Sequence, residues 1–385
     1  MRQLRRRRVE ILWNASQGPD SYAVSMPDAT RARARLVAQG LVTRPFETAA
    51  DAVGAFVAMQ GQDLPGAISS AALRVRGGTA QGVLDDLSAG RLVRGYPMRG
   101  TVFLMPAEDV IWVTELCAAP AVRAARNRRH QLGLDHTHVD EAFAVAERAL
   151  ADGPIPRPVL FQLWADGVFD PQGGRGYHVL AALISETRLC YGPWNGTEQD
   201  VALAEEWLPS GRTVAERFDG DRVPAVAELL RRYLTSHGPA TLRDFAWWTK
   251  LSLGEIRRAL PLIVDDLEAD GAAEPAYWRP GLLDEVAALG RASSAPLLLP
   301  GFDEFVLGYQ DRTFAMTEAE HQRIVPGNNG VFRRTILAGG RVVGTWARGG
   351  RPGRRTLMVD EFAPLSDARR RTLSRLFDAF PFVGE

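Results

Sequence analysis

The order of apolar and polar positions along the chain repeats three times as short amphipathic helices followed by two strand-like runs. Apolar residues spaced three and four positions apart predict helices, and alternation predicts strands. The predicted helices cover residues 30–38, 48–59 and 79–87 in the first repeat, 158–165 and 176–186 in the second, and 226–234, 241–248 and 253–260 in the third. The strand-like runs cover 92–96 and 101–105, 189–191 and 201–204, and 264–267 and 275–278. The Asn195-Gly196 pair predicts a tight turn in the second hairpin.

The third repeat has the clearest boundaries between its elements. A His-Gly-Pro sequence at 237–239 ends one helix, and Thr241 can cap the next one with Asp244 three positions on. Ser252 can cap the last helix with Glu255 in the same way. Helix, short turn, helix and hairpin in this order are typical of a winged helix-turn-helix. A generic α+β assembly is the alternative for one such unit, but three units in a row favour an α+β chain of tandem winged helices.

Residues 296–385 differ from the repeats and predict a β-meander that closes on a helix. An apolar run at 296–300 is followed by alternation over 332–337, 341–346 and 356–362, and then by a helical pattern over 366–377. The connection at 349–353 is rich in glycine, and four arginines lie in or beside it: Arg348, Arg351, Arg354 and Arg355. A flexible cationic hairpin tip could probe a groove of DNA, although composition alone favours a solvated loop.

These patterns divide the chain into five parts: a basic tail at 1–26, winged-helix units at 27–139, 140–222 and 223–290, and a β-rich region at 291–385. Five arginines in the first eight residues are not followed by an apolar segment, so they do not form a secretory signal. We expect this tail to be disordered, or to precede a true start at Met26. A chain of 385 residues is long enough for several domains.

The composition is typical of a soluble globular protein, with 46% apolar and 24% charged residues. No run approaches the length of a transmembrane helix, so we expect a cytoplasmic protein without membrane contact. Two cysteines are too few for a disulfide framework or a four-cysteine zinc site. Phosphate-binding-loop, zinc-protease and nucleophile-elbow motifs are absent, and the close histidine pair His136 and His138 has no cysteine nearby. We therefore expect neither a metal nor a cofactor.

The net charge of zero conceals an uneven distribution. Residues 1–139 carry 18 basic and 12 acidic side chains (+6), residues 140–300 carry 15 and 24 (−9), and residues 301–385 carry 13 and 10 (+3). Two basic ends could present separate cationic surfaces to a polyanion. Lys250 is the only lysine among the 46 basic residues, so lysine chemistry has one candidate. Trp247 and Trp248 could stack on bases, although positions in a core are favoured.

Gln60 and Gln62 are candidates for chemistry because they flank Gly61 at the predicted end of the second helix. If Gly61 breaks that helix, both amides can point into one cleft. Glutamines at helix ends more often hydrate or cap the helix, so the pair by itself is a weak signal.

Gln60-Gly61-Gln62-Asp63 resembles the Gln-x-Gln signature of the AlkZ-like (YcaQ-related) winged-helix bacterial DNA glycosylases. Further matching segments are 98–101 (MRGT), 238–251 (GPATLRDFAWWTKL), 299–312 (LPGFDEFVLGYQDR) and 332–346 (FRRTILAGGRVVGTW). The similarity runs from about residue 28 to the C-terminus. Two positions depart from the family pattern: the family usually has an aliphatic residue in place of Gly61, and often a histidine in place of Phe103.

The resemblance implies three winged-helix units in a C shape around double-stranded DNA, acting as a monomer at the nucleoid. It implies hydrolysis of the N-glycosidic bond of bulky N7-alkylguanine, in repair or in self-resistance to a DNA-alkylating natural product, with interstrand crosslinks as a further substrate to test. Gln60 and Gln62 would face the developing oxocarbenium ion and hold the attacking water. Asp63 would supply a carboxylate base or cap the next turn, and the cap is slightly favoured.

Phosphate contacts are expected from the hairpin arginines and from a second set of basic side chains: Arg99, Arg123, Arg126, Arg128 and Arg129. These roles depend on charge and position, and a solvated surface is the alternative. Because a lyase needs an amine and Lys250 is far from Gln60 in the sequence, we predict a monofunctional glycosylase. The alternative function is a non-catalytic winged-helix DNA-binding protein such as a transcriptional regulator. The glutamine pair and the long β-rich region favour the enzyme.

Overall fold

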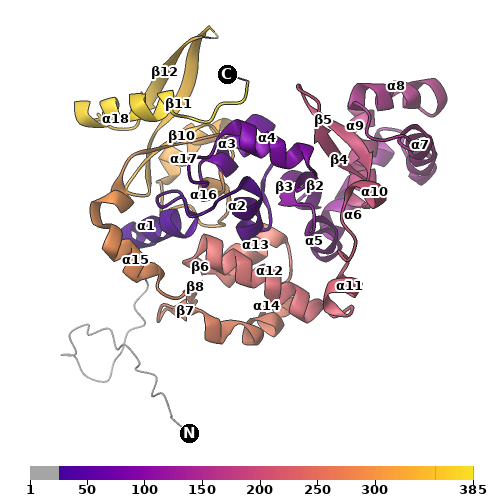
Figure 1. The fold of residues 1–385 in the computed structure, drawn as a ribbon. Coiled ribbons are helices and arrows are strands. Elements are labelled where there is room, and N and C mark those ends of the chain that lie inside the picture. Colours follow the sequence, from indigo (N-terminus) through magenta and orange to yellow (C-terminus); the bar gives the residue numbers. More distant parts are fainter. Residues whose placement is uncertain (1–25, 352, 385) are drawn as a thin grey trace.

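The computed structural model describes residues 26–351 and 353–384 (Figure 1). Except for Met26, the predicted N-terminal tail therefore lies outside the described residues. The described chain combines helices with several small antiparallel sheets, in agreement with the predicted α+β class. No helix in these two ranges is both long enough and apolar enough to cross a membrane.

The first part of the chain builds a three-stranded antiparallel sheet that carries Gln60. Its strands are β1 (Met59–Gln60), β2 (Leu92–Met98) and β3 (Thr101–Pro106), in the order β1-β3-β2. The helices of this part are α1 (Asp28–Ala38), α2 (Ala49–Phe56), α3 (Leu64–Ala72), α4 (Ala80–Ser88), α5 (Val110–Cys117) and α6 (Ala119–Gln131). Strands β2 and β3 confirm the two strand-like runs recognised in the sequence. Phe103, Leu104 and Met105 of β3 are all fully buried, so this strand packs on both faces.

The prediction that the second helix reaches residue 59 was wrong, and Gln60 lies on a strand instead. A capping box between Thr48 and Asp51 starts α2, but the helix ends at Phe56. Val57 has a φ of +67°, which a helix cannot continue through, and the chain then pairs with β3. Neither glycine nor proline marks this stop in the sequence, which explains the error. Helix α3 was also missed.

The middle of the chain forms a compact helical group around a hairpin. Its elements are α7 (His136–Ala149), α8 (Arg157–Gly167), α9 (Arg175–Ser185), β4 (Leu189–Trp194), β5 (Gln199–Leu203), α10 (Ala204–Trp207) and α11 (Val214–Phe218). The predicted turn is confirmed, because Asn195 Oδ1 accepts the backbone N–H groups of Thr197 and Glu198, each over 3.0 Å. The fully buried Trp164 packs between these helices and donates its indole N–H to the carbonyl oxygen of Ala142.

The third repeat contains its three predicted helices, although α12 extends beyond the predicted range at both ends. It comprises α12 (Arg222–His237), β6 (Ala240–Thr241), α13 (Leu242–Thr249), α14 (Leu253–Ala259), β7 (Glu268–Ala269), β8 (Ala276–Trp278) and α15 (Leu282–Leu289), with the sheet order β6-β8-β7. The two capping boxes, Thr241 with Asp244 and Ser252 with Glu255, are both formed. The strand predicted at 264–267 was wrong: Val264–Asp266 is a 3-10 turn, because alternation over four residues does not separate a strand from a short turn.

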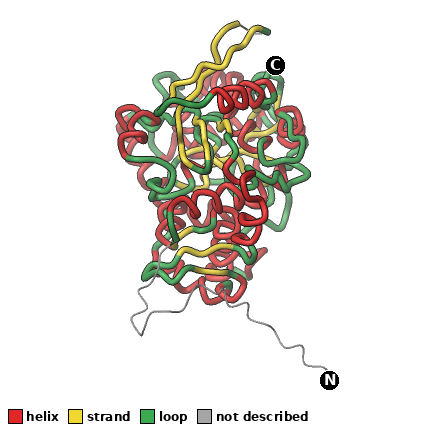
Figure 2. Tube along the Cα trace, turned by 90° about the vertical axis from the view of Figure 1, so that its left-hand side faces the viewer, coloured by secondary structure: helices red, strands yellow, loops and turns green. Residues whose placement is uncertain are grey.

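The C-terminal region is a four-stranded antiparallel sheet, as the alternation predicted. Its elements are β9 (Leu297–Leu299), α16 (Glu304–Leu307), α17 (Glu318–Ile324), β10 (Thr335–Ala338), β11 (Arg341–Arg351), β12 (Arg354–Glu361) and α18 (Asp367–Asp378), with the order β12-β11-β10-β9. The connection at 349–353 was predicted to be a flexible loop, but its ends are paired strand, with Gly349 opposite Thr356 and Arg351 opposite Arg354. The resulting ribbon β11–β12 projects beyond the body of the molecule (Figures 1 and 2).

The core is shared between parts of the chain that are distant in sequence. Helix α1 packs against α15, and one hydrophobic cluster joins Ala32 of α1, Phe245 of α13 and Leu337 of β10. The Arg35 side chain of α1 lies 3.6 Å from the centre of the Tyr309 ring. The first, third and C-terminal parts therefore pack as one body. Their division into winged-helix units remains a prediction.

Candidate active site

The two glutamine side chains meet where the chain leaves β1. Gln60 is 5% exposed, whereas Gln62 lies at the surface. Gln60 Nε2 donates a hydrogen bond to Gln62 Oε1 over 3.4 Å, and Arg99 Nη2 donates to Gln60 Oε1 over 3.5 Å. Both distances are at the outer limit of hydrogen bonding. The amides therefore share one site without being locked together, and each keeps acceptor capacity for a ligand.

Strand pairing explains why glycine separates the two glutamines. Gln60 is paired with Phe103 of β3, and the Gly61 N–H donates to the carbonyl oxygen of Val102 over 2.8 Å. A Cβ atom on Gly61 would lie 2.8 Å from the backbone of Phe103 and of Leu104, which is closer than side chains pack. Phe103 itself is fully buried. Both departures from the family pattern thus lie at one tight crossing of β1 and β3.

A buried carboxylate that sequence reasoning missed supports the backbone of β1. Glu304 Oε1 accepts the backbone N–H of Gln60 over 2.7 Å, and Glu304 Oε2 lies 3.4 Å from His237 Nε2. Glu304 and His237 are at most 1% exposed. Burial lowers the pKa of His237, although the charge of Glu304 opposes this shift. The signal in the sequence was an acidic pair, Asp303-Glu304, inside an otherwise apolar segment.

The other member of that acidic pair, Asp303, anchors the segment from which Glu304 projects. Both carboxylate oxygens of Asp303 accept hydrogen bonds from the Arg74 guanidinium over 3.0 Å, and Ser70 Oγ donates to Asp303 over 2.6 Å. The Arg74 and Asp303 side chains are fully buried. Removing one partner of such a pair costs about 3–5 kcal/mol. The pair therefore joins α3 to α16 and holds Glu304 beneath β1.

Asp63 directly precedes α3, is half-buried and lines a cavity. Burial raises the pKa of its carboxyl group, while the Arg334 charge and the backbone N–H of Gly66 partly offset the shift. The cavity has a volume of about 610 Å³, and its apolar lining includes Phe302 and Met358. A carboxyl group with a raised pKa is suited to accept a proton, but neither Gln60 nor Gln62 is among the residues that line this cavity.

The predicted tryptophan pair is split between the core and the site. Trp248 is fully buried, as expected, whereas Trp247 is only partly buried. Arg99, at the turn between β2 and β3, lies 4.8 Å from the centre of the Trp247 ring, and Lys250 lies 5.6 Å from it. The fold thus brings Lys250 close to the arginine that contacts Gln60, despite their separation in sequence.

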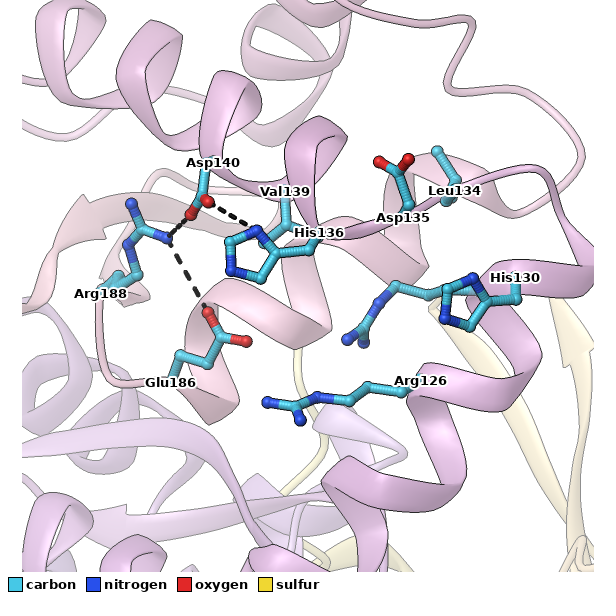
Figure 3. Close-up of a pocket in the computed structure, with 10 residues that line it drawn as sticks. Arg126, His130, Leu134, Asp135, His136, Val139, Asp140, Glu186 and Arg188 are labelled. Atoms are coloured by element: carbon cyan, nitrogen blue, oxygen red, sulfur yellow. Dashed lines mark hydrogen bonds and ion pairs between the residues drawn. The ribbon is translucent and has the colours of Figure 1, made fainter.

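The arginines of α6 lie around a different pocket, between α6, α7 and α9. Arg123, Arg126 and Arg128 are exposed, but Arg129 is only 6% exposed and forms part of the pocket wall. The side chains of Arg126, Glu186 and Arg188 extend into the same space of about 390 Å³ (Figure 3). Ion pairs inside the pocket offset part of this positive charge: His136 Nδ1 and Arg188 Nη1 each lie 2.8 Å from an oxygen of Asp140.

The four hairpin arginines differ in their surroundings. Arg351 and Arg354 are exposed at the end of the ribbon. The guanidinium carbon of Arg348 lies 4.8 Å from the centre of the Phe382 ring, and Arg355 donates to the carbonyl oxygen of Gly350 over 2.9 Å. The tip thus presents two exposed cations on a paired ribbon. Within residues 26–351 and 353–384, no group of three or more His, Cys, Asp or Glu side chains is arranged to hold a metal ion.

Comparison with known proteins adds sequence and fold evidence to this geometry. The sequence model of the family described as DNA glycosylase AlkZ-like matches residues 53–380. An interstrand DNA cross-link repair glycosylase from Streptomyces sahachiroi is 26% identical over 327 residues, covering 81% of this chain and 85% of the relative. The solved structure of the DNA glycosylase AlkZ from the same organism has a TM-score of 0.71 at 20% identity, covering 93% of this chain and 96% of the other. That likeness shows a shared fold, and the family match covers most of the sequence. This chain therefore belongs to the AlkZ-like DNA glycosylase family.

Proposed function

We propose that this chain is a monofunctional enzyme that hydrolyses the N-glycosidic bond of bulky N7-alkylguanine in double-stranded DNA. The observation that carries the proposal is the meeting of the Gln60 and Gln62 amides beside Arg99, above a fully buried supporting carboxylate. Such a site supplies oriented dipoles in a fixed backbone frame. That is the arrangement expected where catalysis depends on positioning and charge stabilisation.

The reaction suits polar but uncharged side chains. An N7-alkylated guanine already carries a positive charge, so it departs as a neutral base without strong help from a general acid. The sugar then develops oxocarbenium character. The oxygen of each amide has a second lone pair beyond the one used in the Gln60, Gln62 and Arg99 contacts. These lone pairs can face the sugar cation and orient the attacking water.

Asp63 is the proposed acceptor of the proton that this water loses. Asp63 follows Gln62 directly in the sequence, and burial raises the pKa of its carboxyl group above that of an ordinary aspartate. A raised pKa makes the carboxylate a stronger base than that of an ordinary aspartate. The structural alternative, a helix cap for α3, uses the same position and is separated from the base by the pH profile described below.

A bulky adduct favours access to the sugar from a groove over extrusion of the base. Extrusion carries the whole modified base into a pocket, and a large or crosslinked adduct obstructs that movement. The projecting β11–β12 ribbon, with exposed Arg351 and Arg354, is the proposed groove contact. The printed description of the Streptomyces sahachiroi relative, an interstrand cross-link repair enzyme, supports testing crosslinked guanine as a substrate. We propose that the chain acts as a monomer on nucleoid DNA, in repair or in self-resistance.

The test is base release from a duplex that contains one N7-methylguanine. Incubation with the full chain, followed by alkaline cleavage, should cut the labelled strand at the lesion. A duplex with unmodified guanine is the control. Sequence-specific binding without base release would instead favour the alternative function, a winged-helix regulator.

The monofunctional assignment has its own test, because Lys250 lies near the site. If water is the nucleophile, borohydride should trap no covalent adduct between enzyme and DNA. Trapping that disappears in Lys250→Ala would show that the lysine forms a Schiff base and that the enzyme is a lyase.

A further inference from the structure

Three cationic side chains from three separate segments surround the indole ring of Trp247. Arg99 lies 4.8 Å from the ring centre, Arg312 lies 5.2 Å from it and Lys250 lies 5.6 Å from it. Arg99 comes from the β2–β3 turn, Trp247 and Lys250 from the end of α13, and Arg312 from the segment after α16. Helices α13 and α16 and strands β2 and β3 are all drawn near the middle of Figure 1. We refer to these four residues as the indole–cation cluster.

The cluster concentrates positive charge without a matching carboxylate. Among the described residues, none of its three cations forms an ion pair with an aspartate or glutamate. Arg312 donates through Nε to the carbonyl oxygen of Val306 over 2.8 Å and lies 3.5 Å from His321 Nε2. The nearby Glu304 attracts Arg99, but its carboxylate is buried against Gln60 N and His237. The polar contacts of Arg312 are thus with neutral oxygen and nitrogen atoms.

The pKa values of Arg99, Arg312 and Lys250 are all lowered in this arrangement. Burial lowers the pKa of Arg99, and burial together with Arg99 lowers the pKa of Arg312 to about 10. Burial and Arg99 also lower the pKa of Lys250. Like charges that are partly removed from water repel one another strongly. An anion bound among the three cations would relieve this repulsion.

We propose that the indole–cation cluster binds one phosphodiester group of the damaged strand, next to the nucleotide whose base is released. The inference depends on the proposed function, because it identifies how that site holds its substrate. Arginine guanidinium groups match phosphate oxygens with two parallel donors, and lysine adds a compact charge. The flat indole face of Trp247 keeps the two arginines in place while leaving their donors to face the ligand.

The position of the cluster means that a bound phosphate would align the deoxyribose with Gln60. Arg99 contacts both the Trp247 ring and, over 3.5 Å, the amide oxygen of Gln60. In a nucleotide, the phosphate and the anomeric carbon are only a few covalent bonds apart. A phosphate held by Arg99 and Arg312 therefore brings the deoxyribose opposite Gln60. Trp247, Lys250 and Arg312 act as positioning residues in this scheme, because none is assigned to the reacting atoms.

The experiment removes the phosphate charge and the protein charge separately and then together. Duplexes with one N7-methylguanine carry a single neutral methylphosphonate at each position in turn on either side of the lesion. Single-turnover base release is measured for the wild type, Arg312→Gln and Lys250→Gln. Lys250 is exposed, so its variant tests the cluster even if Arg312→Gln folds poorly. Arg76→Gln is the matched control, because the Arg76 side chain is 70% exposed and pairs with Glu47 on the surface.

One methylphosphonate position should slow wild-type base release by about tenfold to a hundredfold, the range of a charge-assisted hydrogen bond to a buried partner. The same modification should cost little further in Arg312→Gln or Lys250→Gln, whereas Arg76→Gln should respond as the wild type does. If every phosphate position gives equal losses in wild type and in both cluster variants, the proposal is overturned. Loss of activity in Trp247→Leu without any effect of methylphosphonate would also overturn it, in favour of stacking on a base.

A binding measurement separates this proposal from the proposed function. The same methylphosphonate series in a duplex with a tetrahydrofuran abasic analogue measures affinity without chemistry. Coupling between one phosphate and Arg312 in this series supports the cluster even if N7-methylguanine is not released, which would refute only the proposed reaction. Absence of coupling there, with active wild-type enzyme, overturns the cluster alone. Losing one phosphate contact in Arg312→Gln should also reduce the slope of log K against log salt by about 0.9.

Discussion

Truncation of Gln60 or Gln62 to alanine is the sharpest test of the active site. The backbone of Gln60 is held by Glu304 over 2.7 Å and by pairing with Phe103, and neither contact involves the Gln60 side chain. The side-chain contacts at 3.4 and 3.5 Å are at the limit of hydrogen bonding, so their loss should cost about 1 kcal/mol of stability or less. Gln62 is exposed, so its truncation should lower the stability by even less.

The effect on chemistry should be much larger than the effect on stability. Removing one preorganised polar group from a charge-stabilising site lowers the rate by about 10²–10³, or about 2.7–4 kcal/mol of transition-state stabilisation. The cationic leaving group places the expected loss at the lower end of this range. Because Gln60 and Gln62 orient one water together, the double variant should lose much less than the product of the two single losses. Duplex affinity should stay close to that of the wild type.

The assay is single-turnover release of N7-methylguanine with enzyme in excess, together with thermal unfolding of each variant. Gln81→Ala is the control, because this glutamine is exposed on α4 and its side chain donates to Asp85 Oδ1 over 2.8 Å. Wild-type rates in both single variants would refute the catalytic assignment. A rate loss that follows the loss of folded protein would assign the glutamines a structural role instead.

Four further perturbations test the remaining assignments. Arg351→Ala with Arg354→Ala should slow removal of bulky adducts more than it lowers the melting temperature, and equal losses would make the ribbon structural. Asp63 loses its charge as the pH falls through its raised pKa, so the wild type should show an acid limb above pH 3.8 that Asp63→Asn lacks. Arg334→Gln removes a charge that lowers this pKa and should move the limb to higher pH; a limb that persists in Asp63→Asn would exclude the base. Duplex binding should weaken with salt, with a slope of about −0.9 per phosphate contact, and salt-independent binding would contradict the cationic surfaces.

Local features of the chain could be predicted because nearby residues determine them. The capping boxes at Thr241 and Ser252 need partners only three positions away, and both are formed. The Asn195 side chain organises its own turn by bonding to the next residues. The strands β10, β11 and β12 follow runs of apolar positions, because Ile336 and Trp346 pack with α18 while Leu337 and Val342 join the central core. In each case a local pattern of residues is enough to indicate the element.

The candidate site depended on tertiary structure at every step. The Gln-x-Gln pattern located the glutamines, but β1, which carries Gln60, exists only because β3 pairs with it across about forty residues of sequence. A Cβ atom on residue 61 would lie 2.8 Å from the backbone of β3, so glycine fits this pairing without a shift of the strand. Glu304 reaches Gln60 from 244 positions away, and Lys250 reaches the Arg99 neighbourhood from another segment. Such contacts are set by long-range packing and by the burial of charge, which a local pattern of residues does not encode.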